Sequence, residues 1–140
     1  MSGSVRVVRA TTMAEIEAAA YLFDQAVGRS ASLRFLADPT HHLLLAWRDE
    51  EVLGFVSGIE TTHPDKGTEM FVYELEVGEA HRRQGVGTSL VRALAQVAED
   101  AGCYGMWVLT DHDNAAALAT YRAAGAEPPT PHVMLGWSIQ

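Results

Sequence analysis

The chain has 140 residues, of which 48% are hydrophobic and 20% are charged. This length predicts one domain, residues 1–140, with enough apolar side chains to form a core, so we do not expect a disordered chain. Ten Lys and Arg residues against 18 Asp and Glu residues give a net charge of −8. This charge argues against a nucleic-acid partner and favours a cationic small molecule or a cationic peptide.

Cysteine content and hydropathy indicate the compartment. Cys103 is the only cysteine, which excludes a disulfide framework and fits a reducing environment. The uninterrupted apolar stretches are much shorter than a membrane span, and the first residues lack the pattern of a signal peptide. We therefore expect a cytoplasmic protein with no membrane partner.

The N-terminal half predicts a strand, a helix, a short helix, a β-hairpin and a polar loop. Thr12 and Glu15 form a capping-box pattern at the start of the first helix, and Gly28 is the expected residue after its end. Two apolar runs separated by four charged residues indicate the hairpin. The expected bounds are 4–9, 12–28, 33–36, 42–47 with 52–59, and 61–68.

The C-terminal half alternates strands with helices. A β-type run is followed by a glycine-containing loop, an amphipathic helix, a strand, an alanine-rich helix and a last strand. The expected bounds are 69–77, 81–87, 86–101, 104–110, 114–124 and 132–139. Hairpins in the first half and β-α-β units in the second predict an α/β (α+β) fold with a mixed sheet. Trp107 and Trp137 lie in apolar strands, so we expect them in the core.

The loop before the amphipathic helix has the composition of an anion-binding site. It reads Arg82-Arg83-Gln84-Gly85-Val86-Gly87-Thr88. A helix N-terminus offers backbone N–H groups without intrahelical partners, and glycines let a ligand approach the backbone closely. The segment lacks the Lys-Ser/Thr of a Walker loop, and Leu90 occupies the third glycine position of a dinucleotide fingerprint. The loop is either a pyrophosphate cradle or a tight turn with solvated arginines.

Three motifs in register give the chain a family resemblance. Arg82-x-x-Gly85-x-Gly87, the preceding Leu75-Glu76-Val77 and the downstream Asn114-x-x-Ala117-x-x-x-Tyr121-x-x-x-Gly125 resemble the GNAT family of N-acetyltransferases. The resemblance spans about residues 43–139. It implies a sheet of about six to seven strands with splayed parallel strands, and acetyl-CoA as co-substrate. The residues implied for its binding are Leu75, Glu76, Val77, Arg82, Arg83, Gln84, Gly85, Val86, Gly87, Thr88, Asn114, Ala117 and Tyr121.

A narrower resemblance concerns the acceptor. The runs Phe71-Val72-Tyr73-Glu74-Leu75-Glu76-Val77 and Glu79-Ala80-His81-Arg82-Arg83-Gln84-Gly85 are similar to type I aminoglycoside 3-N-acetyltransferases. This similarity implies acetyl transfer to the 3-amino group of an aminoglycoside antibiotic, hence a resistance enzyme. Glu74 and Asn114 stand where that group usually has aspartate, and the proline-rich turn at 127–131 differs from its pattern.

Carboxylates are the candidates for amine chemistry, because an ammonium group must lose a proton before it can attack a thioester. Glu74 and Glu76 are two residues apart on a strand and share a face. Glu74 is the first choice as base, and both could bind the amine; alternatively they form a solvent-exposed face. Asp111 and Asp113 follow the next strand and could bind a second ammonium group or cap the following helix.

Other candidate residues would protonate the leaving group or stabilise the negative charge that develops during the reaction. By the family resemblance Tyr121 would protonate the leaving thiolate, although it could be a packed helix residue. The backbone N–H of Val77 would stabilise the oxyanion. Asn114 could bind the co-substrate or act only as a helix cap. The six histidines show no metal-binding motif, and Cys103 has no adjacent base, so we expect neither a metal nor an acetyl-cysteine intermediate.

Alternative functions share this framework. The acceptor could be a polyamine, an amino acid, a protein lysine or an N-terminus, and the loops at 28–41 and 61–67 that would decide this show no recognisable motif. The chain could also be a non-catalytic acyl-CoA-binding module. Exposed pairing groups on an edge strand at 132–139 would favour a homodimer.

Overall fold

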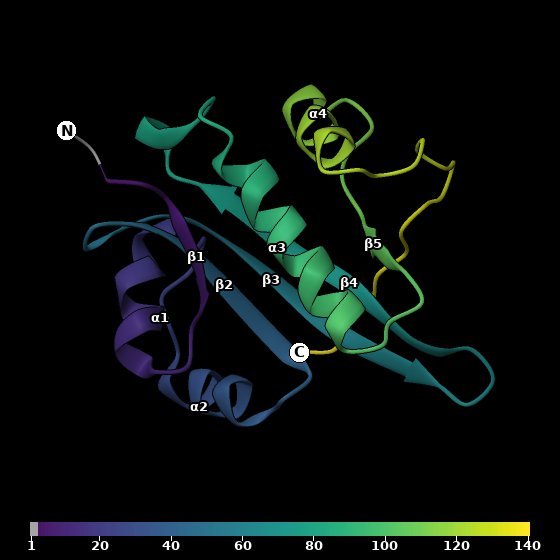
Figure 1. Cartoon of the computed structure of the whole chain (residues 1–140). Coiled ribbons are helices and arrows are strands. Elements are labelled where there is room, and N and C mark those ends of the chain that lie inside the picture. Colours follow the sequence, from purple (N-terminus) through teal and green to yellow (C-terminus); the bar gives the residue numbers. More distant parts are fainter. Residues whose placement is uncertain (1–2) are drawn as a thin grey trace.

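The computed structural model describes residues 3–140 and contains one five-stranded mixed sheet (Figure 1). The strands follow chain order, and each neighbouring pair is antiparallel except β4 and β5, which are parallel. This architecture confirms the predicted mixed sheet and the parallel pair, but with five strands instead of six or seven. The strands are β1 (Arg6–Arg9), β2 (His41–Arg48), β3 (Glu51–His63), β4 (Gly67–Val77) and β5 (Met106–Val108).

Helices cover the two faces of the sheet unequally. They are α1 (Met13–Ala19), α2 (Arg29–Ala37), α3 (Val86–Asp100) and α4 (Ala115–Ala123), with short 3₁₀ turns at Ala20–Leu22 and Glu79–His81. The long helix α3 lies across one face, and α1 and α2 lie behind the other (Figure 1). None of the helices described between residues 3 and 140 is long and apolar enough to cross a membrane.

Each face has its own hydrophobic core. On the α3 face, Leu90 and Leu94 pack with Val56 and Met70, and all four are fully or almost fully buried. On the opposite face, α1 and the following 3₁₀ turn pack on a cluster that includes Phe55. The amphipathic pattern of residues 86–101 correctly predicted which side of α3 is buried.

The first helix is shorter than its apolar spacing predicted. The capping box is present, with Thr12 accepting from the Glu15 N–H at 3.2 Å. However, α1 ends at Ala19, and Phe23 has extended backbone angles. The Phe23 ring contacts Phe55 edge-on at 4.8 Å between centroids, so tertiary packing draws the chain out of the helix. Gly28 therefore precedes α2 as its N-cap and does not end α1.

The central hairpins are longer than predicted. The β2–β3 hairpin forms as expected and turns at Asp49, whose φ is +54°. The expected polar loop at 61–68 is wrong, because β3 and β4 remain paired as far as His63 and Gly67. The hydroxyl groups of Thr62 and Thr68 are 2.9 Å apart across this ladder. Cross-strand threonine pairing favours strand structure in a segment that its polarity assigned to a loop.

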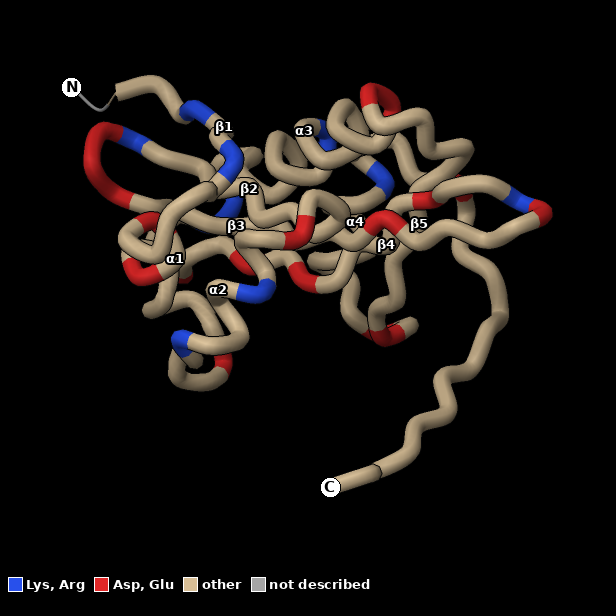
Figure 2. The backbone as a smooth tube through the Cα atoms, turned by 90° about the horizontal axis from the view of Figure 1, so that it is seen from below, with Lys and Arg blue, Asp and Glu red and all other residues tan. Residues whose placement is uncertain are grey.

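The C-terminal segment forms no strand in this structure, which corrects the prediction for residues 132–139. It leaves the body of the protein as an extended tail (Figure 2). Trp137 is 82% exposed instead of buried in a core, and Trp107 on β5 is 41% exposed. A strand needs a neighbour for its backbone groups, and the tail is paired with no strand among residues 3–140.

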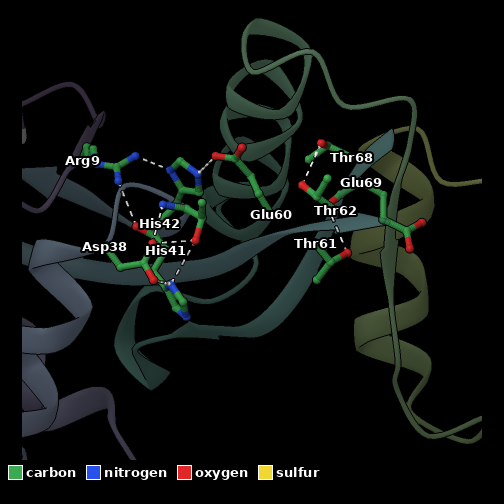
Figure 3. A network of polar contacts seen from close by, with 10 residues as sticks. Arg9, Asp38, His41, His42, Glu60, Thr61, Thr62, Thr68 and Glu69 are labelled. Carbon is green, nitrogen blue, oxygen red and sulfur yellow. Dashed lines mark hydrogen bonds and ion pairs between the residues drawn. The ribbon is translucent and has the colours of Figure 1, made fainter. Parts of the chain in front are cut away.

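A buried polar network ties the first three strands together at the end of the sheet below α3 (Figure 3). His42 is 4% exposed, and its Nε2 donates to Glu60 Oε2 at 2.6 Å. Arg9 donates to His42 Nδ1 and also to the carbonyl oxygen of His41, the latter at 2.9 Å. Every polar atom of this imidazole has a partner, so the network is a structural feature of the core edge.

Candidate active site

A one-residue bulge in β4 decides which of its side chains face α3 and which face the opposite side of the sheet. Ser57 of β3 pairs with Glu74, whereas the next residue, Gly58, pairs with Val72, so Tyr73 is an extra residue in β4. A bulge reverses the alternation of the residues that follow it. Val72 therefore packs towards α3, and beyond the bulge so does Leu75.

Glu74 and Glu76 consequently face away from α3, towards the connection between α1 and α2. The predicted shared face is correct, and both carboxylates are half-buried. Burial raises the pKa of Glu74, and the nearby charges of Asp24 and Glu76 raise it further, together with a hydrogen bond to Asp24. A carboxylate with a raised pKa is better matched to proton transfer near neutral pH.

Glu76 has a side-chain partner within the chain. Arg82 donates to Glu76 Oε1 at 3.0 Å and, through Nε, to the carbonyl oxygen of Val77 at 3.1 Å. These two bonds fasten the loop before α3 to the end of β4. The geometry makes Glu76 an anchor for this loop and leaves Glu74 with Asp24 as the carboxylate pair at the gap.

The loop before α3 has the backbone geometry of an anion cradle. Arg83 and Gly85 have φ angles of +63° and +80°, and Gly85 is the N-cap of α3 with no side-chain hydrogen bond at that cap. Nothing lies within 4 Å of a Cβ built on Gly85. An uncapped N-terminus of a 15-residue helix offers N–H groups without intrahelical partners, which suits a pyrophosphate.

Two further contacts brace this cradle from the β2–β3 turn. Arg48 donates to Gln84 Oε1 at 3.3 Å, and Nε2 of His81 lies 2.5 Å from Oε1 of Glu51. The side chain of His81 is only 18% exposed. The predicted cradle residue Gln84 is therefore held by its side chain, and its position depends on the hairpin turn.

Close packing joins the cradle to α4. A Cβ built on Gly87 lies 3.1 Å from Thr120 Cγ2, 3.6 Å from Val77 Cγ2 and 3.8 Å from Leu75 Cδ2. Thr88 is half-buried and Val86 is buried at the start of α3. A glycine is needed at position 87 because β4, α3 and α4 pack closely together there.

Helix α4 supplies the other candidate side chains. The Asn114 side chain accepts from the Ala117 N–H at 3.1 Å. Asn114 is therefore the N-cap of α4, which is one of the two roles predicted for it. Ala117 and Tyr121 are half-buried. Burial raises the pKa of Tyr121. This phenol stays protonated at neutral pH, which suits a proton donor and not a base.

The gap itself lies between β4 and β5. Their ladder has only three pairs, from Met70 with Met106 to Val72 with Val108. Beyond these pairs the backbone of β4 facing β5 has no strand partner among residues 3–140. An extended amide-containing chain, such as the pantetheine arm of acetyl-CoA, could supply hydrogen bonds there. The chain thus fits this co-substrate in both its phosphate cradle and its strand edge.

Two further predicted residues precede α4. Asp111 and Asp113 are exposed in the turn before α4, and their backbone carbonyls accept from the N–H groups of Asn114 and Ala115. Burial raises the pKa of the Cys103 thiol, which keeps it protonated. Within residues 3–140 no three His, Cys, Asp or Glu side chains are grouped to hold a metal ion.

Sequence reasoning missed Asp24 and Glu51. Asp24 falls in the segment that the apolar spacing assigned to a helix, and only the extended backbone at Phe23 brings it to Glu74. Glu51 belongs to a charged hairpin turn, and nothing in that turn indicates a contact with His81.

Comparisons with known proteins agree with this geometry. Residues 10–126 match the model of the Acetyltransferase (GNAT) family. A mycothiol acetyltransferase from Salinispora arenicola is 38% identical over 89 residues, which cover 61% of this chain and 27% of that protein. The chain spans between a quarter and about a third of the length of the curated relatives it matches.

Solved structures with the same fold match nearly the whole chain. An aminoglycoside acetyltransferase from an uncultured soil metagenomic sample, in complex with sisomicin, has a TM-score of 0.88 at 17% identity, and the match covers 97% of each chain. AAC(6')-Iy in complex with a CoA-S-monomethyl-acetylneamine bisubstrate analogue has a TM-score of 0.83 at 17% identity, with 97% and 99% covered. At these identities the likeness concerns the fold.

Proposed function

Because the chain belongs to the Acetyltransferase (GNAT) family, we propose that it transfers an acetyl group from acetyl-CoA to a primary amine of a cationic small molecule. The observation that carries this proposal is the pair formed by Glu74 and Asp24 beside the β4–β5 gap. This pair combines a negative field for an ammonium group with a carboxylate that can accept its proton.

The donor would lie along the gap, with its thioester supplying the activated acetyl group. The uncapped start of α3 and Gly85 would hold the pyrophosphate, with Arg83 adding positive charge. The backbone of Leu75 and Val77 would bind the pantetheine amides. Val86, Gly87 and Thr88, the first turn of α3, would contribute to this phosphate site, and Arg82 and Gln84 would keep the loop in place.

Transfer would proceed by direct attack. Glu74 takes a proton from the ammonium group, and the neutral nitrogen attacks the thioester carbonyl carbon. The Val77 N–H would stabilise the oxyanion. As the C–N bond forms, the C–S bond breaks, and the Tyr121 hydroxyl gives its proton to the sulfur. The nitrogen releases its second proton to solvent, and proton exchange with water then restores the Tyr121 phenol and the Glu74 carboxylate.

An aminoglycoside is the acceptor class we favour. The net charge of −8 and the carboxylate pair suit a polycation, and several solved proteins of the same fold are named aminoglycoside acetyltransferases. The sequence resemblance indicated the 3-amino group, whereas the neighbours named with a position are of the 6' type. The 3-amino position stays a prediction that product mapping must test.

The experiment measures release of the CoA thiol from acetyl-CoA with a panel of amines. The panel contains gentamicin-type and kanamycin-type aminoglycosides, spermidine, an amino acid and a lysine peptide. Mass spectrometry and NMR of the product then locate the acetyl group. Glu74→Gln is compared with Glu69→Gln, which changes the same residue type on the same strand, away from the gap.

We expect turnover with aminoglycosides, loss of about 10²–10⁴-fold in kcat for Glu74→Gln and normal rates for Glu69→Gln. Turnover only with another amine would show that the acceptor is not an aminoglycoside, while the proposed acetyl transfer would stand. Tight acetyl-CoA binding without turnover on any amine would instead indicate a binding module. Equal rates for Glu74→Gln and the native chain would reject Glu74 as the base.

A further inference from the structure

Two segments that are far apart in the sequence meet beside the start of α3. One is the turn between β2 and β3, residues 48–51, and the other is the loop from the end of β4 to α3, residues 78–85. Asp49 and Arg83, one in each segment, are the only non-glycine residues between 3 and 140 with a positive φ. Such conformations persist only where the surrounding contacts hold them. Contacts around these two segments must therefore maintain their backbone.

The β2–β3 turn contacts the loop on both sides of Arg83. Before Arg83, Nε2 of His81 lies 2.5 Å from Oε1 of Glu51. After Arg83, Arg48 donates to Gln84 Oε1 at 3.3 Å. Two side-chain contacts thus hold the residues that flank the left-handed position, and both contacts come from the same turn.

The imidazole of His81 is confined by packing. Its side chain is 18% exposed, against 60% for Glu51. The loop begins at Gly78, whose N–H donates to the Leu53 carbonyl at 2.8 Å and whose carbonyl accepts from the His81 N–H at 2.8 Å. A Cβ built on Gly78 would lie 3.2 Å from His81 Cδ2 and 3.3 Å from the hydroxyl oxygen of Tyr21. The loop therefore follows the position of this ring, and the Glu51 carboxylate is the polar partner that holds the ring.

We propose that Glu51 is a positioning residue for the phosphate site. Through His81 it holds the loop in the left-handed conformation at Arg83 and Gly85 that forms this site. The inference rests on the proposed use of acetyl-CoA as the donor. A loop that adopts the binding conformation for only part of the time binds its ligand more weakly in proportion, so loss of the Glu51 contact lowers the affinity for acetyl-CoA.

The negative charge of Glu51 gives the proposal a distinctive sign. The phosphates of acetyl-CoA are anions, so a carboxylate near them opposes binding by Coulomb repulsion. On charge alone, removal of Glu51 would strengthen binding, whereas loss of a positioning residue weakens it. Glu50 is the matched control, because it is the neighbouring carboxylate of the same turn and is also exposed.

Isothermal titration with acetyl-CoA, in the absence of an amine, measures the affinity. We expect Glu51→Ala to raise the dissociation constant about 5–10-fold, whereas Glu50→Ala leaves it unchanged or lowers it. Glu51→Gln keeps an acceptor oxygen of the same shape and should restore most of the native affinity. If Glu51 acts through His81, the double variant Glu51→Ala with His81→Ala should bind no more weakly than His81→Ala alone.

Hydrogen exchange of the ligand-free chain tests the loop without acetyl-CoA. The N–H groups of His81 and Ser89 donate to backbone carbonyls of the loop at 2.8 and 3.1 Å, so they report on its two ends. Glu51→Ala should speed the exchange of both amides about 5–10-fold. Glu50→Ala should not, and the Ala101 amide at the other end of α3 should be unchanged in both variants.

Three results would overturn the proposal. They are equal affinities and exchange rates for Glu51→Ala and Glu50→Ala, tighter acetyl-CoA binding by Glu51→Ala, and a double variant that binds more weakly than His81→Ala. A native chain that binds no acetyl-CoA would overturn the proposed function instead. Hydrogen exchange would still decide in that case whether Glu51 holds the loop, so the two failures are distinguishable.

Discussion

Gly85 and Gly102 lie at opposite ends of α3 and share nearly the same backbone conformation, with φ angles of +80° and +78°. A Cβ built on either residue meets nothing within 4 Å. Replacing each with alanine therefore changes only the backbone energy, without a steric clash. Comparing the two alanine variants therefore separates the effect of the Gly85 conformation on ligand affinity from its effect on the stability of the fold.

We predict that Gly85→Ala and Gly102→Ala destabilise the fold by similar amounts. A left-handed conformation costs a residue with a Cβ about 1–2 kcal/mol. For a chain of this length, each kcal/mol lowers the melting temperature by about 3–4 °C. Only Gly85→Ala should also weaken acetyl-CoA binding. If its loop relaxes and binding must restore the left-handed turn, the same 1–2 kcal/mol raises the dissociation constant about 5–30-fold.

Differential scanning calorimetry measures the stability of both variants, and isothermal titration with acetyl-CoA measures binding without any acceptor amine. Equal weakening by both variants would mean that the effect is transmitted through stability and not through the cradle. Unchanged affinity in Gly85→Ala, despite the full loss of stability, would refute our account of the cradle as the phosphate site.

The remaining predictions concern proton transfer. Asp24→Asn should move the acidic limb of the kcat/KM profile to lower pH, because the Asp24 charge and hydrogen bond help to raise the pKa of Glu74. If the acidic limb does not move, Asp24 does not act on the catalytic base. Because the pKa of Glu74 is raised in the folded chain, its ionisation destabilises the fold. The contribution of Glu74 to stability therefore falls as the pH rises through its pKa in the folded state. Glu74→Gln should therefore raise the melting temperature at pH 8 but not at pH 4. Tyr121→Phe should lower kcat about 10²-fold or more with little change in melting temperature, and normal turnover would show that Tyr121 only packs.

Local signals in the sequence were sufficient for much of the fold. The capping box at Thr12, the hairpin turn at Asp49 and the Asn114 N-cap all depend on residues a few positions apart, and all are present. The turn at Gly85 that opens α3 was predictable for the same reason, since Gly85 and the start of the helix are adjacent in the chain. Short-range chemistry decides these features whatever surrounds them.

Features set by distant contacts were not predictable in the same way. The extended backbone at Phe23 depends on its contact with Phe55, and only that break brings Asp24 to Glu74. The polar residues around Thr62 form strands because Thr68 lies opposite. The tail at 132–139 has a strand pattern, but a pattern does not supply the neighbour that a strand requires.

The bulge at Tyr73 shows why the site could be predicted in part although its cause could not. Alternation placed Glu74 and Glu76 on one face whether or not a bulge was present, so their shared face was correctly predicted. Which face they share depends on Tyr73, because without the extra residue Glu74 would follow Met70 and Val72 into the core under α3. The bulge therefore does two things at once. It keeps two charges out of a buried apolar layer, and it presents Glu74 to Asp24 beside the edge of β4 that β5 leaves uncovered. A single inserted residue thus converts a core strand into one wall of the candidate active site.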